Sequence, residues 1–149
     1  MSYLIIILII AVALAPLSHF VPSKAQRKVA RLREYAALNR FFVEFRDLPN
    51  QKIKARGGAL AHTIYYGRRI RPALDGPPQR LCWLFEQGRW TGSPIKVAVP
   101  EAVLTLPDGV LAASADSESC GIYWLETGDE AEIDQIGVVL DALIEKLYK

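Results

Sequence analysis

The carboxyl-terminal segment "TGDEAEIDQIGVVLDALIEKLYK", from Thr127 to Lys149, decides the fold class of this chain. Thr127 and Glu130 have the spacing of a capping box, and acidic residues crowd the turn that follows. The large apolar residues recur at alternating steps of three and four and form one stripe: Ile133, Ile136, Leu140, Leu143 and Leu147. The segment therefore predicts an amphipathic helix that lies across a sheet as the second layer of an α+β domain.

Segments that alternate apolar and polar residues predict the sheet itself. In "RFFVEFRDLP" (40–49), the alternation puts Phe41, Val43 and Phe45 on one side of a half-buried strand. "LCWLFEQGRW" (81–90) alternates likewise and turns at Gln87 and Gly88. Further strands are expected in "ALAHTIYYGRR" (59–69), "GVLAAS" (109–114) and "GIYWLE" (121–126), and one short helical turn in "VPEAVLTLPDG" (99–109). The expected architecture is a small antiparallel sheet of about four to five strands with the carboxyl-terminal amphipathic helix packed on it.

The amino-terminal segment is apolar on every face. "YLIIILIIAVALAPLSHFV" (3–21) contains no charged side chain unless His19 is protonated, and Pro16 falls near its end, where a kink is tolerated. About 20 residues are needed to cross the roughly 30 Å hydrocarbon core of a bilayer. We therefore expect a transmembrane anchor over residues 1–22, whose leading membrane contacts are Leu4, Ile5, Ile6, Ile7, Leu8, Ile9, Ile10 and Pro16. A cleaved signal peptide is the alternative, because two A-x-A triplets occur, but the positive n-region of such a peptide is missing.

A run of basic residues follows the anchor. Ser23 and Gln26 have capping-box spacing, and residues 23–40 predict a basic juxtamembrane helix. Because bases follow the apolar segment and none precedes it, the positive-inside rule puts the amino terminus outside and the α+β domain, residues 41–149, in the cytoplasm. The predicted location is the bacterial inner membrane, with a single span. Two unpaired cysteines, Cys82 and Cys120, agree with a reducing compartment.

The net charge of +2 conceals a strong asymmetry. The chain carries a charge of +10 between Lys24 and Arg71 and −8 from Asp75 onward. Such a division points to charged partners or to internal pairing. The candidate contacts with an anionic surface or a partner are Lys24, Arg27, Lys28, Arg31, Arg33, Arg68, Arg69 and Arg71. The expected partners are membrane lipid and a protein at the inner membrane, with nucleic acid as an alternative because "YYGRRIR" (65–71) mixes aromatic rings with bases.

The sequence presents no catalytic constellation. His62 has no serine, cysteine or aspartate at a telling distance, and both cysteines lie in apolar strands, where thiols are usually inert. The acidic run Asp129, Glu130, Glu132 and Asp134 does not follow the calcium-loop pattern and is explained by a helix start. We therefore expect a non-enzymatic protein with no metal and no cofactor.

The layout of a short outer tail, one span, "VPSKAQRK" and a small cytoplasmic domain resembles the accessory subunit of the bacterial preprotein translocase. It also resembles other small single-pass proteins of the bacterial inner membrane. The glycine-rich barrel of the translocase subunit is not visible in this sequence, so no functional residue is transferred. The leading interpretation is a membrane-anchored cytoplasmic interaction domain, an accessory subunit of an inner-membrane complex. The alternative is a membrane-tethered binder of anionic lipid or nucleic acid.

Overall fold

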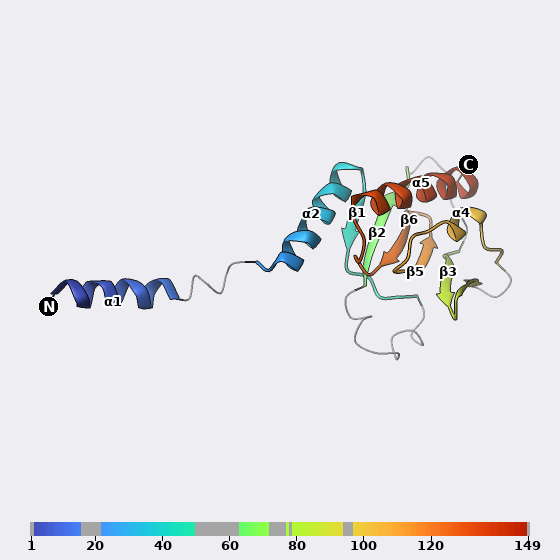
Figure 1. Ribbon diagram of the computed structural model, residues 1–149. Helices are drawn as coiled ribbons and strands as arrows, with labels where there is room; N and C mark the ends of the chain where they lie inside the picture. Colours follow the sequence, from blue (N-terminus) through green and yellow to red (C-terminus); the bar gives the residue numbers. More distant parts are fainter. Residues whose placement is uncertain are drawn as a thin grey trace. The chain divides into compact units, whose positions relative to one another are not determined.

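The computed structural model describes residues 2–15, 22–49, 63–71, 77, 79–93 and 97–148. Its contacts divide the chain into two compact units, Met1–Arg31 and Leu32–Lys149. Within the described residues the architecture is α+β, with four helices and one antiparallel sheet of six strands (Figure 1). The helices are α1 (Ser2–Leu14), α2 (Lys24–Leu38), α4 (Glu101–Leu104) and α5 (Glu130–Leu147). The strands are β1 (Phe42–Glu44), β2 (Ile64–Arg69), β3 (Leu81–Glu86), β4 (Arg89–Ser93), β5 (Val110–Ala115) and β6 (Ser119–Trp124).

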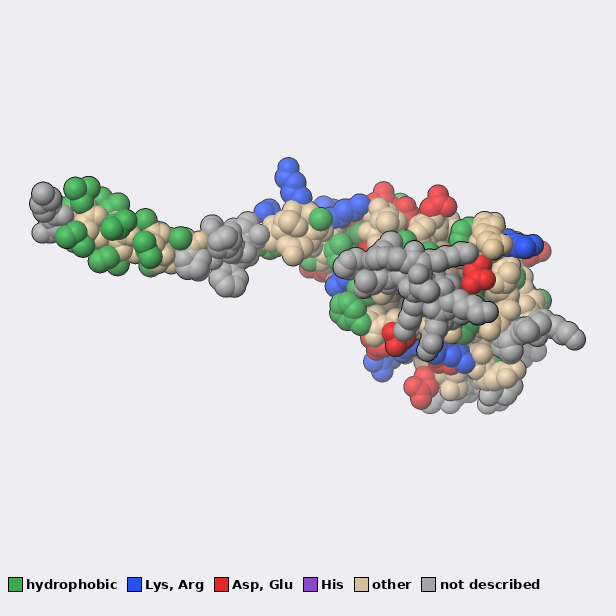
Figure 2. Space-filling view, turned by 90° about the horizontal axis from the view of Figure 1, so that it is seen from below, with side chains coloured by type: hydrophobic (Ala, Val, Ile, Leu, Met, Phe, Trp, Pro, Cys, Tyr) green, Lys and Arg blue, Asp and Glu red, His purple; other side chains and the backbone are tan. Residues whose placement is uncertain are grey.

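The first unit contains α1 and the first half of α2. Every side chain described from Tyr3 to Leu14 is exposed, and hydrophobic groups run along α1 (Figure 2). None of the helices in the described part of the chain has both the length and the apolarity that a membrane crossing requires. The predicted anchor also includes residues 16–21, with Pro16, which lie outside the described residues. The capping box of α2 is confirmed, because the Ser23 N–H donates to Gln26 Oε1 (2.8 Å) and the Gln26 N–H to Ser23 Oγ (3.2 Å).

The second unit is the folded domain, built on a sheet with the strand order β1-β2-β6-β5-β3-β4. All five strand pairs are antiparallel. The hairpin between β3 and β4 turns at Gln87 and Gly88, as predicted, with φ values of 52° and 78° that match the right-handed twist of the flanking strands. In the hairpin between β5 and β6, Asp116 Oδ1 accepts hydrogen bonds from the N–H groups of Glu118 (3.0 Å) and Ser119 (2.8 Å).

Helix α5 covers one face of the sheet, which confirms the predicted second layer (Figure 1). Its stripe residues Ile133, Ile136, Leu140 and Leu143 are fully buried, together with Trp83 and Trp124 of the sheet. A smaller cluster around Tyr65, Leu84 and Tyr123 occupies the opposite face.

Three expectations were wrong in detail. The sheet has six strands instead of four to five, because the half-exposed β4 also pairs with β3. Phe45 is 83% exposed, since β1 already ends at Glu44 and the alternation stops there. Helix α5 is capped by Asp129, whose carboxylate accepts from the N–H groups of Ala131 and Glu132 (3.0 and 3.3 Å), and not by a box of Thr127 and Glu130. His62 and the other predicted strand residues of 59–62 lie outside the described residues.

Candidate anion-binding groove

The outer edge of the folded domain is left partly open by its shortest strand. β1 pairs only with residues 65–67 of β2, through the partners Phe42–Gly67, Val43–Tyr66 and Glu44–Tyr65. On its other side β2 stays paired with β6 as far as Arg69, and the Ile70 N–H donates to the Glu118 carbonyl (2.9 Å). The end of β2 therefore extends beyond its outer neighbour.

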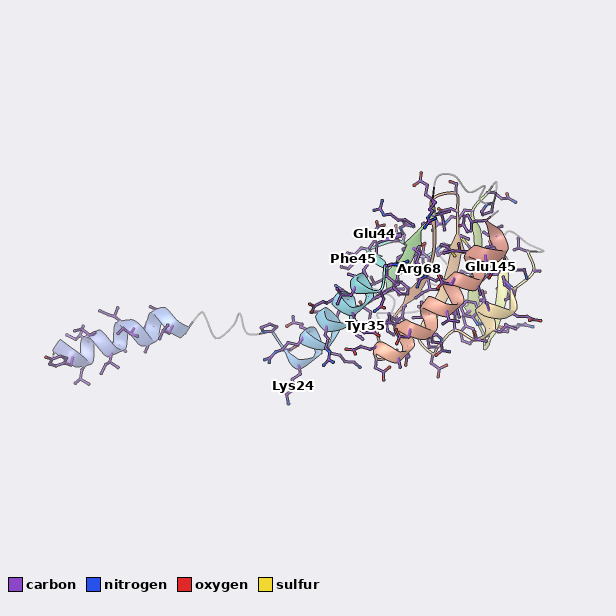
Figure 3. The ribbon with its side chains drawn as sticks, turned by 90° about the horizontal axis from the view of Figure 1, so that it is seen from above. Lys24, Tyr35, Glu44, Phe45, Arg68 and Glu145 are labelled. Carbon is purple, nitrogen blue, oxygen red and sulfur yellow. The ribbon has the colours of Figure 1, made fainter. Side chains whose placement is uncertain are left out.

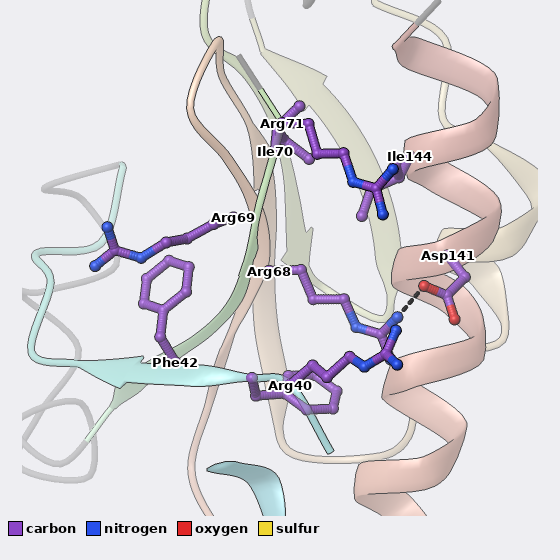
Figure 4. A pocket seen from close by; sticks show the side chains of 9 residues that line it. Arg40, Phe42, Arg68, Arg69, Ile70, Arg71, Asp141 and Ile144 are labelled. Carbon is purple, nitrogen blue, oxygen red and sulfur yellow. Dashed lines mark hydrogen bonds and ion pairs between the residues drawn. The ribbon is translucent and has the colours of Figure 1, made fainter. Parts of the chain in front are cut away.

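A groove of about 570 Å³ lies at this open edge. The groove is lined by Arg40, Phe41, Phe42, Arg68, Arg69, Ile70, Arg71, Asp141 and Ile144. The side chains of Arg40, Arg68 and Arg71 point toward α5, whereas Arg69 lies beside Phe42 on the other side of the strand (Figure 4). Sequence reasoning selected Arg68, Arg69 and Arg71, and the structure brings all three together with Arg40. We call Arg40, Arg68 and Arg71 the arginine cluster.

Arg68 is the best-held member of the cluster. Its guanidinium pairs with Asp141 of α5 and lies 5.1 Å from the centre of the Phe41 ring. Gly137 leaves room for this approach, because a Cβ at that position would lie 3.1 Å from Arg68 Nη2, closer than most real contacts. Arg68 lies beside α5 in Figure 3 as well. Its Nε is buried and has no hydrogen-bond partner among the described residues, so one of the N–H donors of its guanidinium is unused there.

Arg40 reaches the groove from an unusual backbone position. The Phe41 N–H donates to the Ala36 carbonyl (3.0 Å) and the Arg40 N–H to the Ala37 carbonyl (3.2 Å), which is the Schellman pattern that ends a helix. This pattern requires a left-handed residue at Arg40, whose φ is 65°. Glycine usually occupies such a position, so no local pattern indicates that an arginine here contributes to a site.

On the other side of β2 the arginines stack on aromatic rings. Arg69 lies 5.3 Å from the centre of the Phe42 ring and stays exposed. Arg46 lies 4.1 Å from the Tyr65 ring centre and donates to Glu44 (2.9 Å) and to Ser119 Oγ (3.2 Å). Arg46 is therefore engaged within the domain, while Arg69 presents its charge to the solvent.

Arg33, another predicted contact residue, is engaged inside the folded domain. Its guanidinium donates two hydrogen bonds to Glu126 (2.7 and 2.8 Å), and the Tyr66 hydroxyl donates a third (2.8 Å). The Glu126 side chain is only 6% exposed. The hydrogen bond to Glu126 raises the pKa of Arg33, while burial and then Glu126 raise the pKa of Tyr66. This arrangement fastens the second half of α2 to the sheet.

The remaining predicted bases lie in the first unit. Lys24, Arg27, Lys28 and Arg31 are all exposed on the first half of α2. Arg27 Nε donates to the Pro22 carbonyl (3.0 Å), just before the helix begins. These residues form a separate basic surface, which we call the juxtamembrane bases because they follow the predicted anchor.

The described residues offer little for covalent chemistry. Burial raises the pKa of the Cys120 thiol to about 12, and burial also raises that of Cys82, so both thiols are protonated and poorly nucleophilic at neutral pH. Within the described part of the chain, no group of three or more His, Cys, Asp or Glu side chains is placed to hold a metal ion. Comparison of the chain with family models, with curated proteins and with solved structures gave no match.

Proposed function

We propose that this chain is a membrane-anchored interaction protein whose folded domain holds an anionic segment of a protein partner in the groove at the end of β2. The arginine cluster carries the proposal. It gathers the guanidiniums of Arg40, Arg68 and Arg71 against a single lining carboxylate, that of Asp141. An excess of positive charge in a partly enclosed site favours a bound anion.

Arginine suits this role better than lysine. Its planar guanidinium binds a carboxylate through two parallel hydrogen bonds and also stacks on aromatic rings. Asp141 pairs with Nη1 of Arg68, but its side chain is 61% exposed, so the solvent weakens this ion pair. A groove of about 570 Å³ accommodates a few residues of a chain rather than a whole globular surface.

The amino-terminal segment supports the membrane part of the proposal. The residues from Tyr3 to Leu14 are apolar and exposed on all sides of α1, and an isolated helix of this kind is poorly soluble in water. A bilayer is the environment that such a surface favours. With the juxtamembrane bases inside, the folded domain is held in the cytoplasm at the inner membrane, as expected of an accessory subunit.

The proposal is tested with the full chain in nanodiscs of zwitterionic lipid. A fluorescein-labelled hexaglutamate peptide serves as the probe, and fluorescence anisotropy measures its dissociation constant. We expect Arg71→Glu to weaken binding at least tenfold, whereas Arg89→Glu, the same charge change on the exposed β4, leaves it within twofold. Equal affinities of the two variants, or no binding by the unaltered chain, would contradict the proposal.

A second candidate function is electrostatic docking on anionic lipid through the juxtamembrane bases. Its support is the exposure of Lys24, Arg27, Lys28 and Arg31 directly after the predicted anchor. Each base near an anionic surface contributes about 1 kcal/mol, and the interaction is screened by salt. Amide exchange of residues 24–31 in nanodiscs tests it. Exchange should slow when phosphatidylglycerol replaces zwitterionic lipid at low salt and recover at high salt; identical exchange in all conditions would exclude this docking.

A further inference from the structure

We infer that the anionic occupant of the groove is an extended acidic peptide segment, which adds as a new strand at Arg69, on the side of β2 that β1 leaves open, with the Arg71 side chain beside it. This inference rests on the proposed function and specifies the form of the partner. It follows from the direction of the backbone groups, from the distribution of the arginines and from the charge of the edge.

The backbone of β2 has hydrogen-bonding groups to offer at this edge. In an antiparallel sheet, the N–H and C=O groups of successive residues point to alternate sides of the strand. Ile70 donates toward β6 through Glu118, so the N–H and C=O groups of Arg69 point to the outer side. Among the described strands, β1 pairs only with residues 65–67 and leaves Arg69 without an outer neighbour. Among the described residues, no hydrogen bond from the Arg69 backbone to an outer partner is formed.

The arginine side chains beside this edge would pair with acidic side chains on both faces of an added strand. Arg40, Arg68 and Arg71 lie toward α5, and Arg69 lies on the opposite face (Figure 4). Side chains of the added strand also alternate between these two faces. Carboxylates at successive positions therefore each meet a guanidinium, while the buried Ile70 provides an apolar floor between them.

The charge of the edge excludes the most obvious rival strand, a second copy of this chain. Pairing two identical edges would bring Arg69 and Arg71 of one copy close to those of the other, and like charges across a strand pair are destabilising. Exposed strand edges commonly carry charges that prevent such self-pairing. The same charges favour an acidic strand. A lipid headgroup or a phosphate would use the guanidiniums and leave the backbone groups unpaired.

The experiment separates backbone pairing from charge alone. The probe is a fluorescein-labelled peptide of alternating Glu and Val, eight residues long, made in three forms: unmodified, N-methylated at every Glu, and N-methylated at every Val. The two methylated forms have the same charge and composition and differ only in which edge of the extended peptide retains its N–H groups. Each form is titrated into the full chain in zwitterionic nanodiscs.

If the peptide adds as a strand, one methylated form binds at least tenfold more weakly than the other. In addition, the unmodified peptide should slow amide exchange at Arg69 at least tenfold. Equal binding of the three forms, or unchanged exchange at Arg69, would overturn the strand inference and leave the proposed function standing if hexaglutamate still binds. Binding of a thymidine oligonucleotide or of phosphatidylglycerol vesicles, without binding of either acidic peptide, would overturn both.

Discussion

At the scale of single residues, Arg40 combines a strained backbone with a charge in the groove. Its φ of 65° places a side chain where glycine is usually found. A non-glycine residue in this region costs on the order of 1 kcal/mol, and such costs are common at functional sites. The guanidinium that the strain positions belongs to the arginine cluster. Stability and binding should therefore respond to Arg40 in opposite directions.

We predict that Arg40→Gly stabilises the folded domain by about 0.5–1 kcal/mol and weakens hexaglutamate binding at least fivefold. Glycine relieves the left-handed strain but removes the guanidinium. Arg40→Ala is the matched control, because it removes the same charge and keeps the strain: it should weaken binding equally without any gain in stability. Urea unfolding of the full chain in detergent, followed by the fluorescence of the buried Trp83 and Trp124, measures the stability. A loss of stability in Arg40→Gly would show that the αL residue is not strained.

At the scale of elements, two glycines on neighbouring strands make room for one ring. Gly67 of β2 and Gly121 of β6 are direct partners, and the Tyr65 ring lies over them. A Cβ on Gly67 would come within 2.5 Å of Tyr65 Cε1 and 2.8 Å of Phe42 Cζ. These contacts are too short for real atoms, so the rings have to move. The packing of β1 on β2 depends on this absence of side chains.

We predict that Gly67→Ala destabilises the folded domain by about 1–3 kcal/mol through overpacking. In a Tyr65→Leu background the added cost should be smaller, because the nearest clashing ring is gone. The difference between the two costs is measured by a double-mutant cycle with the same urea unfolding assay. Additive effects of the two substitutions would contradict a clash with Tyr65.

The elements that the sequence predicted well are those with a strong local period. The stripe of α5 and the hairpin of β3 and β4 contain their own signal, because neighbours in space are also close along the chain. The limits of elements were predicted less well. Phe45 continues the alternation of β1, but the strand ends at Glu44. The N-cap of α5 is Asp129 and not the predicted Thr127. Such choices depend on tertiary contacts that a local pattern does not contain.

The groove was only half predicted, for the same physical reason. Arg68, Arg69 and Arg71 are adjacent in sequence and stood out as a basic run. Arg40 joins them because β1 pairs with β2, and Asp141 joins them because α5 crosses the sheet. The pairing of Arg33 with Glu126 likewise spans most of the chain. Each of these contacts requires the fold before it can be recognised.

At the scale of the whole molecule, a buried thiol and a buried phenol make the folded state sensitive to high pH. Burial raises the pKa of Cys120 to about 12 and that of Tyr65 also to about 12. Both groups are neutral when protonated, and the unfolded chain releases their protons near pH 8.5 and 10 respectively. Their contribution to stability is therefore complete below about pH 8 and is lost as the pH rises toward 12.

We predict that the free energy of unfolding is constant between about pH 7 and 8 and declines above about pH 9. The decline is up to about 1.4 kcal/mol per pH unit for each proton that the folded state keeps and the unfolded state has released. In Cys82→Ala/Cys120→Ala the decline should begin about one pH unit later, because tyrosine alone then contributes. Urea midpoints at a series of pH values measure both chains. If the onset does not move in the double variant, other groups control alkaline unfolding.

The proposed attachment to the membrane concerns the whole molecule, because α1 and the juxtamembrane bases would contribute two different forces. An apolar anchor is insensitive to salt, whereas exposed charges lose their attraction at 1 M salt, where the Debye length is about 3 Å. The two forces can be separated by substitution. Ile7→Arg puts a charge in the middle of the apolar segment, at a cost of about 2.5–3.5 kcal/mol for insertion. Changing Lys24, Arg27, Lys28 and Arg31 to Gln removes the charges and leaves that segment intact.

We predict that the chain expressed in bacteria stays with the membrane fraction after a wash with 1 M NaCl. Ile7→Arg should shift a large share of the protein into the soluble fraction, and Ala30→Arg on the exposed surface of α2 should not. The four-glutamine chain should remain attached, but with mixed orientation, since the positive-inside signal is weakened. Protease added to spheroplasts reports the orientation, because only outward-facing domains are cut. If instead the salt wash releases the unaltered chain, the bases hold it at the membrane, and the anchor proposal is wrong.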